Sequence, residues 1–477
     1  MLESRLLLVH HSVFFWRGSV LNVPASGTRS AADAAQAEFA AIVGESRVTA
    51  DSAACEGFTV DGKVPSCVVY AASAEEVAAV LQCAADHELA VLPCRNLTKI
   101  GIGHPPRRYD VALSLKEMNR VWYYEPADLV ISVEPGMKLG DFQHFVGRHR
   151  LWLPLDPAGG ARASLGGILA ASSSGPLRSA YGTPRDMVLG MKIATTEGKV
   201  IKTGGRVVKN VTGYDMAKLL IGSYGTIGVI VEASFKLYPL PAARATFVLR
   251  LSTLDGACEL RRRIQRSPLQ PQRLVLLDAE ASKLVRSGSP LAPAANTEIS
   301  LWEVWVEAAG SARVIERYAR ELEELGRAVG ARAESEPGES AWARVADFRT
   351  WLSAAYPGLV VLKAVLPISA TEQFLGQVEQ QAEGLRRASL SQIGVGVVCV
   401  CVLEEPGAPS IRPWVERLRA AATSLGGALV VECCPAELKA EIDVWGPPGD
   451  DFEIMRKLKH AWDPKGILSP GRFVGGL

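Results

Sequence analysis

The sequence predicts a mixed α+β protein of two domains, and three observations support this fold class. Residues 66–93 read as a compact strand, helix and second strand. Residues 159–228 hold 14 glycines interleaved with apolar, β-branched segments, a pattern of strands joined by tight turns rather than of a flexible linker. After Pro239 and Pro241, apolar strands alternate with helices over long connections, which indicates a second α/β or α+β domain.

The composition agrees with such a fold and excludes several other classes. A chain of 477 residues with 48% hydrophobic and 22% charged residues has the balance of a globular protein, not of a disordered, collagenous or coiled-coil chain. The 52 basic and 51 acidic residues nearly cancel, so no overall field favours nucleic acid or an anionic membrane. The nine cysteines form no C-x-x-C motif, so we expect reduced thiols in a cytosolic protein and no metal site.

Residues 1–30 are expected to be an extension before the folded part. Their apolar run, residues 6–15, is too short to span a bilayer, and Arg5 before it leaves a signal peptide open. The first helix is expected near Ala31, and no other stretch approaches 18 apolar residues, which predicts no transmembrane segment.

Each element of the first domain has a local signal. The helix after the first strand begins at a capping box, in which the Ser73 side chain accepts from free amides and Glu76 reaches back. A loop at residues 94–106 follows the second strand. The later apolar segments predict strands at 110–114, 129–134, 191–196, 199–203 and 229–237, and a helix at 139–148.

The second domain is read in the same way. Cys399 and Cys401 alternate within an apolar strand, so both side chains are expected to face one core layer. The arginine-rich segment 261–266 is read as a solvated helix face, because no aromatic residues are interleaved with it. Strands are predicted at 247–251, 274–277, 301–306 and 359–362, helices at 312–329 and 370–387, and exposed loops at 286–297 and 334–340.

The common nucleotide motifs are absent from the sequence. The nearest approach to G-x-G-x-x-G is Gly101-Ile-Gly-His-Pro-Pro106, which lacks the third glycine, and no Walker A pattern occurs. The small residues of Ala163-Ser-Leu-Gly-Gly-Ile-Leu-Ala-Ala-Ser-Ser-Ser-Gly175 allow two interpretations. They form either a backbone cradle for phosphate or a tight turn that packs a helix on a sheet.

A set of motifs resembles a known family. Ala163-Ser-Leu-Gly-Gly167, Ser174-Gly-Pro-Leu-Arg178 and Arg185-Asp186 resemble the FAD-binding domain of the vanillyl-alcohol oxidase/p-cresol methylhydroxylase (PCMH-type) FAD-linked oxidases. Gly222-Ser-Tyr-Gly-Thr-Ile-Gly-Val-Ile230, the segment 203–215 and the C-terminal Ser469-Pro-Gly-Arg472 resemble, more narrowly, the E-type FAD-binding subunit of glycolate oxidases. The resemblance runs from about Ala31 to the end of the chain.

The resemblance implies a fold and a cofactor. The expected parts are a two-subdomain PCMH-type FAD-binding domain at 31–245, an α+β cap domain at 246–440, and a segment at 441–477 that returns to the FAD domain. FAD would lie extended between the subdomains, with the cap over its ring system. The residues implied to bind FAD are Arg95, Asn96, Thr98, Lys99, Ser164, Gly166, Gly167, Ser173, Ser174, Gly175, Tyr181, Gly182, Gly228, Val229, Ile230 and Arg472.

Two segments depart from the family pattern. The first phosphate loop, Arg-Gly-Gly-Gly-Ser/Thr-Lys in the family, reads Cys94-Arg-Asn-Leu-Thr-Lys99 here. Leu97 does not easily take a glycine conformation, so weakened or lost FAD binding is expected. The cap segment His-Ala-Gly-x-Gly reads Gln392-Ile-Gly-Val-Gly396, and no histidine occurs between residues 150 and 459.

The catalytic residues therefore stay unassigned at this point. Oxidation of a hydroxy acid needs a base for the hydroxyl proton, a task that suits imidazole at neutral pH. Lys363, Glu404 and Tyr356 are alternatives that the sequence does not rank. Arg386 and Arg387 are either a carboxylate clamp or, as we prefer, surface residues that close a helix.

Three functions follow from the resemblance. The first is an accessory FAD-binding subunit of a glycolate (2-hydroxy acid) oxidase or dehydrogenase complex, with a catalytic flavin subunit and an iron–sulfur subunit as partners. The second is a self-sufficient flavin dehydrogenase of a small 2-hydroxy acid such as glycolate or D-lactate. The third is a non-catalytic subunit that has lost FAD. The protein is expected in the cytoplasm, either free or held at the inner membrane by its partners.

Overall fold

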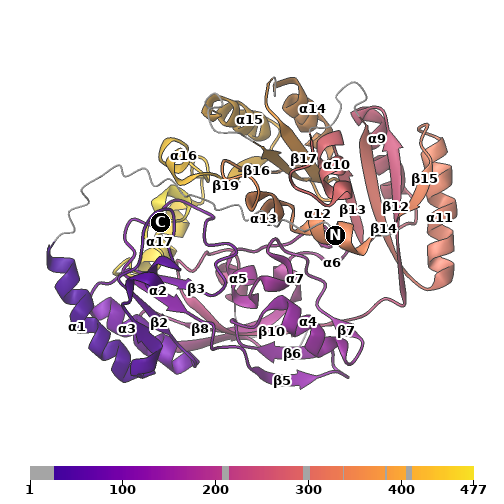
Figure 1. Ribbon diagram of the computed structural model, residues 1–477. Coiled ribbons are helices and arrows are strands. Elements are labelled where there is room, and N and C mark those ends of the chain that lie inside the picture. Colours follow the sequence, from indigo (N-terminus) through magenta and orange to yellow (C-terminus); the bar gives the residue numbers. More distant parts are fainter. Residues whose placement is uncertain (1–25, 207–213, 294–300, 337, 382–383, 404–410) are drawn as a thin grey trace, which may run out of the picture.

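The computed structural model describes residues 26–206, 214–293, 301–336, 338–381, 384–403 and 411–477, which form two bodies (Figure 1). The indigo-to-magenta elements of the first half make the lower body in this view, and the pink-to-brown elements make the upper one. The yellow C-terminal helix α17 (Phe452–Trp462) lies on the lower body. Among the described residues, no helix is long and apolar enough to cross a membrane.

The first sheet of the lower body has four strands in the order β1-β2-β4-β3, of which β2, β4 and β3 are parallel. Its core is covered by helices α1 and α3, through residues such as Phe39 and Leu81. The Ser73 hydroxyl caps α3 by accepting from the Glu76 amide at 3.1 Å, while Glu76 accepts from the Ala72 amide at 2.8 Å. The elements are α1 (Ser26–Val43), β1 (Val48–Thr49), α2 (Ser52–Glu56), β2 (Cys67–Tyr70), α3 (Ala74–Asp86), β3 (Val91–Cys94) and β4 (Val111–Ser114).

The second sheet of the lower body is antiparallel, in the order β5-β6-β10-β8-β9. Helices α4 and α5 cover one face, where Phe142 packs edge-on against Phe235 with ring centroids 5.9 Å apart. A separate two-stranded ribbon pairs β7 with β11. The elements are β5 (Val121–Glu125), β6 (Val130–Val133), α4 (Leu139–Gly147), β7 (Leu151–Trp152), α5 (Leu165–Ala170), α6 (Arg178–Tyr181), α7 (Pro184–Met187), β8 (Val188–Ala194), β9 (Val200–Gly204), α8 (Ala217–Leu220), β10 (Val229–Lys236) and β11 (Tyr238–Pro239).

The upper body is one antiparallel sheet of eight strands, in the order β15-β12-β14-β13-β17-β18-β16-β19. Consecutive residues of β14 enter different cores, Val304 on one face of the sheet and Trp305 on the other, as the pleat of a strand requires. The strands are β12 (Ala243–Leu251), β13 (Arg273–Leu277), β14 (Trp302–Gly310), β15 (Ala333–Glu336), β16 (Val360–Val365), β17 (Arg387–Gln392), β18 (Val397–Val402) and β19 (Ala428–Cys433). The helices are α9 (Leu254–Arg266), α10 (Ala279–Ser287), α11 (Ala312–Arg327), α12 (Glu339–Ala346), α13 (Phe348–Ser353), α14 (Thr371–Gln381), α15 (Arg412–Ser424) and α16 (Ala436–Glu441).

The C-terminal segment packs back onto the lower body. Leu468 forms a parallel bridge with Val91, and its side chain is buried in the core of the first sheet. The buried Lys459 ammonium pairs with Asp463 at 2.6 Å and donates to the Thr226 carbonyl at 2.7 Å. The end of the chain is thereby fixed beside the loop that precedes β10.

Two expectations from the sequence need correction, and three others concern residues that lie wholly or partly outside the described part of the chain. The helix expected at 370–387 ends at Gln381, so Arg387 opens β17 and the interpretation of Arg386 and Arg387 as helix-closing residues is wrong. Gly384, at φ +79°, turns the chain between the two elements. Residues 207–213 of the 203–215 motif, Glu404, and most of the 1–30 extension lie outside the described residues.

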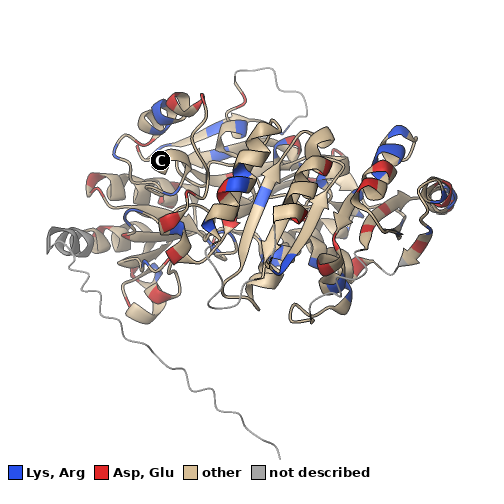
Figure 2. Ribbon diagram, turned by 90° about the horizontal axis from the view of Figure 1, so that it is seen from above, with Lys and Arg blue, Asp and Glu red and all other residues tan. Residues whose placement is uncertain are grey.

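The arginine-rich helix α9 carries its own counter-charges. Arg262 donates to Glu259 at 2.8 Å and to Glu372 at 2.7 Å, and Arg263 also pairs with Glu259. Figure 2 shows blue and red residues mixed over the described helices. The prediction of a solvated helix face therefore holds only in part, because Arg266 is exposed whereas Arg262 and Arg263 are half-buried and Arg261 is buried.

Candidate functional site

A cavity lies in the lower body, where four separate segments meet. These are the loop after β3, helix α5, the loop before β10 and the C-terminal Ser469 and Arg472. Eleven of the residues expected to bind the cofactor line it, namely Arg95, Asn96, Thr98, Lys99, Ser164, Gly166, Gly167, Gly228, Val229, Ile230 and Arg472.

Small residues let backbone form one wall of this cavity. The Ser164 hydroxyl caps α5 by accepting from the Gly167 amide at 3.3 Å. A Cβ on Gly166 would lie 2.6 Å from the Pro135 Cβ, so only glycine permits this approach between α5 and the strand end before it. The two interpretations of the 163–175 segment are therefore compatible, because the tight packing and the open backbone surface occur in the same turn.

The rewritten loop after β3 is held by its own side chains. Arg95 Nε donates to the Gly136 carbonyl at 3.0 Å and its Nη1 donates to Asn96 Oδ1, while Asn96 Nδ2 donates to the Arg162 carbonyl at 2.5 Å. Leu97 nevertheless adopts φ +57°, the left-handed conformation that its side chain was expected to resist. These hydrogen bonds hold the loop in place and offset the cost of that conformation, which is about 1–2 kcal/mol for a residue with a Cβ.

Arg472 closes the cavity from the C-terminal side. Its Nη2 donates to the Ile100 carbonyl and, at 2.6 Å, to the Ile102 carbonyl. Its Nη1 is buried and has no hydrogen-bond partner among the described residues. A buried cation with an unpartnered N–H group at a cavity wall favours an anionic ligand there.

A second and smaller cavity lies between the two bodies. The lower body contributes Ala158 and the segment Ser173, Ser174 and Gly175, all three of them expected cofactor residues. The cap contributes polar and thiol side chains from α13, β16, β17, β18 and β19, namely Arg349, Lys363, Gln392, Cys399, Cys401 and Glu432.

An ion pair dominates the cap wall of this second cavity. Lys363 Nζ lies 2.8 Å from Glu432 Oε1. The register between β16 and β19 shifts between Val361 and Leu362, which leaves Glu432 as an extra residue of β19. Such a bulge re-aims the side chain that it carries. Here it brings Glu432 beside Lys363.

The charges of this wall are tuned by burial and by one another. Burial alone would raise the pKa of Glu432, but Lys363 and Arg349 outweigh it and hold that pKa below its usual value. Glu432 in turn raises the pKa of Lys363. Burial raises the pKa of the Cys399 thiol to about 12, which makes it a poor nucleophile at neutral pH.

Lys99 links the walls of the two cavities, and the charge of Glu432 on the second wall acts on Tyr224 of the first. Lys99 lines the first cavity, and its Nζ donates to the carbonyl of Ala158, a residue of the second, at 2.6 Å. Burial, with a smaller contribution from Arg349, lowers the pKa of Lys99 to about 7. Burial raises the pKa of Tyr224 to about 12, and the Glu432 charge adds to this rise. The two cavities therefore share one electrostatic environment.

Two expected cofactor residues line neither of these cavities. Tyr181 stacks edge-on with Trp152 and Tyr238, and its hydroxyl accepts from Gln272 Nε2 at 2.6 Å, so it joins the two bodies. Gly182, at φ +81°, turns the chain above Asp186. The motif that contains them thus supports the domain interface in this structure.

Of the candidate bases and the two candidate clamp arginines, only Lys363 faces one of the two cavities among the described residues. Lys363 faces the second cavity, whereas Tyr356 donates to the Pro290 carbonyl at 2.9 Å, and Glu404 lies outside the described residues. Arg386 is held by Glu280 and Arg387 by Asp278, so neither lines the two cavities described here.

Three residues that line the two cavities, Arg349, Glu432 and Tyr224, were not among the residues predicted from the sequence. Arg349 Nη2 donates to the Thr98 carbonyl at 3.3 Å, and its Nε is buried with no partner among the described residues. The sequence signal for Glu432 was a lone acid within an apolar segment, and Tyr224 stands inside the quoted Gly222–Ile230 motif.

Comparisons with known proteins agree with this geometry. A family profile described as an FAD binding domain matches residues 65–204, and one described as the C-terminal domain of FAD linked oxidases matches residues 240–473. The chain is 25% identical over 433 residues to the glycolate oxidase subunit GlcD of Bacillus subtilis (strain 168), covering 86% of this chain and 89% of that protein. It is 26% identical over 437 residues to the mitochondrial cytochrome-type D-lactate dehydrogenase of Arabidopsis thaliana, covering 86% and 74% respectively.

Solved structures share the fold. The structure of p-cresol methylhydroxylase with substrate bound superposes with a TM-score of 0.71 at 18% identity, covering 94% of this chain and 97% of that one. A likeness at this level of identity concerns the arrangement of the two bodies.

Proposed function

The chain belongs to the PCMH-type family of FAD-linked oxidases, and we propose that it oxidises the CH–OH group of a small 2-hydroxy acid. FAD is held in the larger cavity and the acid in the smaller one. The observation that carries this proposal is the pair of cavities joined through Lys99, one lined by backbone and small residues and the other by Arg349, Lys363 and Glu432.

The residues of the larger cavity fit FAD. Gly166 and Gly167 place backbone on the cavity wall, where it can approach a pyrophosphate, and the unpartnered Nη1 of Arg472 belongs to a buried positive charge. Arg95 and Asn96 occupy the place of family glycines and present polar side chains instead. When bound, FAD supplies the acceptor for the hydride that leaves the substrate carbon.

The residues of the smaller cavity fit a 2-hydroxy carboxylate. Arg349, with its unpartnered Nε, presents a planar donor group suited to a carboxylate, and Lys363 adds a second positive charge. The buried Gln392 Oε1, also without a partner among the described residues, can accept a hydrogen bond from the substrate hydroxyl. Lys99, with a pKa of about 7, can accept a proton at neutral pH.

The role within an assembly belongs to the same proposal. We favour an accessory FAD-binding subunit, paired with a catalytic flavin subunit and an iron–sulfur subunit, because the phosphate loop and the cap histidine both depart from the family pattern. The named relative in Bacillus subtilis is itself described as a subunit of glycolate oxidase. The cation-lined second cavity favours the alternative of a self-sufficient dehydrogenase. In either role we place the protein in the cytoplasm, free or held at the inner membrane by its partners.

The visible spectrum of the purified chain tests these proposals. Flavin absorbance that glycolate and D-lactate leave unbleached supports the accessory role, and bleaching by either acid supports the self-sufficient enzyme. Absence of flavin after FAD reconstitution contradicts both and supports a non-catalytic subunit.

A variant pair tests the second cavity directly. Arg349→Leu is expected to keep flavin but lose binding of oxalate, a non-oxidisable dicarboxylate that perturbs the flavin spectrum. Arg412→Leu is the matched control, because Arg412 is an exposed residue of α15 that pairs with Glu416 and lines neither of the two cavities. Equal oxalate binding in both variants would contradict the proposed carboxylate site.

A further inference from the structure

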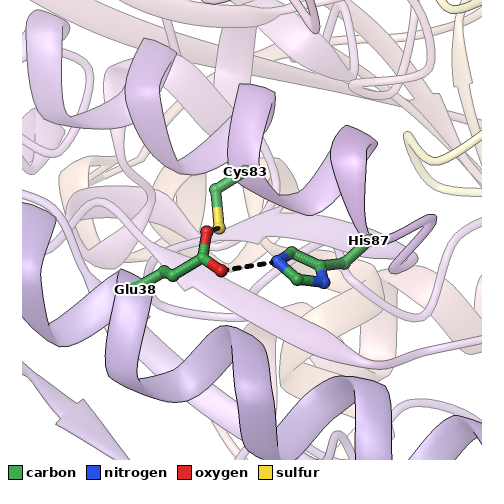
Figure 3. A group of neighbouring side chains, drawn as sticks. All are labelled: Glu38, Cys83 and His87. Carbon is green, nitrogen blue, oxygen red and sulfur yellow. Dashed lines mark hydrogen bonds and ion pairs between the residues drawn. The ribbon is translucent and has the colours of Figure 1, made fainter.

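A third group of chemistry-bearing side chains lies on the first sheet's helical layer (Figure 3). Glu38 projects from α1, Cys83 from α3, and His87 follows α3 as its C-terminal cap. None of the three lines either cavity described above. The group is therefore unused by the proposed oxidation.

The three ligand atoms are close together. Glu38 Oε2 lies 3.4 Å from Cys83 Sγ, and Glu38 Oε1 lies 2.9 Å from His87 Nε2. All three ligand atoms lie within 4.8 Å of one another. Each side chain offers a different donor: a carboxylate oxygen, a thiol sulfur and an imidazole nitrogen.

These separations approach those of a tetrahedral zinc centre. With Zn–S near 2.3 Å and Zn–N and Zn–O near 2.0–2.2 Å, tetrahedral angles set neighbouring donor atoms about 3.4–3.6 Å apart. The distance from Cys83 Sγ to Glu38 Oε2 already has this value. The hydrogen bond from His87 Nε2 reaches the other oxygen of the same carboxylate, Oε1, and needs to open by about half an ångström while the carboxylate turns to present one oxygen to the metal. Rotation of the exposed Glu38 side chain, which is 57% accessible, suffices for that.

The backbone holds the donors in this arrangement. Cys83 and His87 are four residues apart, so they lie on one face at the end of α3. On α1, Ala35, Phe39 and Val43 are buried in the core shared with α3, which fixes the helix that carries Glu38. The site is thus supported by packing on both sides and open to water on its outer side.

We propose that Glu38, Cys83 and His87 bind one Zn²⁺, with a water molecule as the fourth ligand. Thiolate, imidazole and carboxylate together form a donor set that zinc accepts in tetrahedral geometry. Binding replaces the thiol proton of Cys83 by the metal and releases that proton to solvent, with no change of oxidation state. The ion fastens α1 to α3. The sequence has no clustered cysteines and therefore predicted no metal site. It could not reveal this group, because Glu38 lies 45 residues before Cys83 along the chain.

Cobalt binding to the full chain tests the proposal. The purified protein is dialysed against a chelator and titrated with Co²⁺. We expect one equivalent to give a thiolate-to-cobalt charge-transfer band and tetrahedral bands at the red end of the spectrum, where flavin does not absorb. Zn²⁺ should displace the Co²⁺ and abolish these bands.

Variants identify the ligands. Cys83→Ser should abolish the charge-transfer band, and Glu38→Gln and His87→Gln should each weaken Co²⁺ binding more than tenfold, since loss of even an outer-shell partner costs about 10–100-fold. Cys55→Ser and His149→Gln are matched controls that alter a buried cysteine and a histidine outside the group. Circular dichroism verifies that each variant is folded.

Two outcomes would overturn the proposal. One is the lack of stoichiometric Co²⁺ or Zn²⁺ binding in the unaltered protein. The other is binding that Cys83→Ser and Glu38→Gln leave unchanged. Because Glu38 is exposed, Glu38→Gln is expected to fold normally, so its result decides the question even where Cys83→Ser is destabilised.

Discussion

The Lys363–Glu432 ion pair at the second cavity allows a quantitative test of the structure. We consider Lys363→Met and Glu432→Gln, each of which removes one charge at nearly constant size, and the double variant. The two charged atoms lie 2.8 Å apart, and the side chains are only 24% and 19% accessible. The pair is therefore poorly screened by solvent.

The expected cost follows from opposing contributions. At 2.8 Å, the Coulomb attraction is about 6 kcal/mol for an effective dielectric constant of 20. Desolvation of both ions cancels much of this, and removal of one partner of a fully buried pair costs about 3–5 kcal/mol. Because Arg349 also stabilises Glu432 and the pair is partly accessible, we expect each single variant to lower the unfolding free energy by about 2–3 kcal/mol.

A double-mutant cycle in urea, followed by tryptophan fluorescence at neutral pH, measures the coupling. The double variant should lose only about 1–2 kcal/mol, since it leaves no buried charge unpaired, which gives a coupling energy of about 3–4 kcal/mol. The control cycle uses Arg412 and Glu416, which are also 2.8 Å apart but 52% and 55% accessible, and should show little coupling. Strict additivity at Lys363 and Glu432 would refute the reasoning.

The same pair predicts a dependence on pH. Lys363 helps to hold the pKa of Glu432 below its usual value, so the stabilisation is present at neutral pH and is lost as the pH falls through the folded-state pKa. The stability difference between the unaltered protein and Lys363→Met should therefore shrink in acid. A difference that grows as the pH falls would contradict this assignment of charge.

Three further predictions concern the larger cavity. Gly166→Ala places a Cβ 2.6 Å from Pro135 and should lower the unfolding free energy by about 1–3 kcal/mol and reduce the amount of retained FAD. Gly147→Ala, in open space on α4, should do neither. Equal flavin content in the two variants would argue against the packed wall. Leu97→Gly removes the cost of a left-handed conformation, about 1–2 kcal/mol for a residue with a Cβ, and also removes a side chain from the cavity wall. The ratio of FAD to protein after gel filtration should therefore rise. A fall in this ratio would show that the leucine supports the cofactor. Burial lowers the pKa of Lys99 to about 7, so unfolding binds a proton between that pH and the ordinary lysine value. Stability measured by urea titration should therefore rise with pH over that range, by at most about 1.4 kcal/mol per unit, and Lys99→Met should abolish the rise; an unchanged slope in Lys99→Met would refute the assignment.

Much of the lower body follows from local sequence signals. The strand, helix and strand of residues 67–94 form where the apolar periodicity and the Ser73 cap predict them. Local signals failed where neighbours decide the structure. The strand β19 carries Glu432 among apolar residues, so it is recognised only from its pairing with β16. Helix α14 ends at Gln381, six residues before the predicted end.

The wall of the larger cavity was easier to predict from the sequence than the wall of the smaller one, for a physical reason. Backbone close to a ligand requires glycine and other small residues in sequence order, so a motif such as Ser164 to Gly167 reports it directly. The second cavity draws single side chains from separate elements, such as Arg349 from α13, Lys363 from β16 and Glu432 from β19. No spacing along the chain encodes such a set, because the sheet order places its members together.

The absence of histidine between residues 150 and 459 then acquires a chemical meaning. Around the second cavity, ion pairing lowers the pKa of Glu432 and raises the pKa of Lys363, and burial raises the pKa of Cys399 to about 12. These three groups therefore keep one charge state across the neutral range. Lys99 is the described group beside both cavities whose pKa, about 7, falls within that range. Under the proposed function, a lysine made weakly basic by burial can take up the proton of the substrate hydroxyl, and the fixed Lys363–Glu432 pair can orient the acid without titrating alongside it.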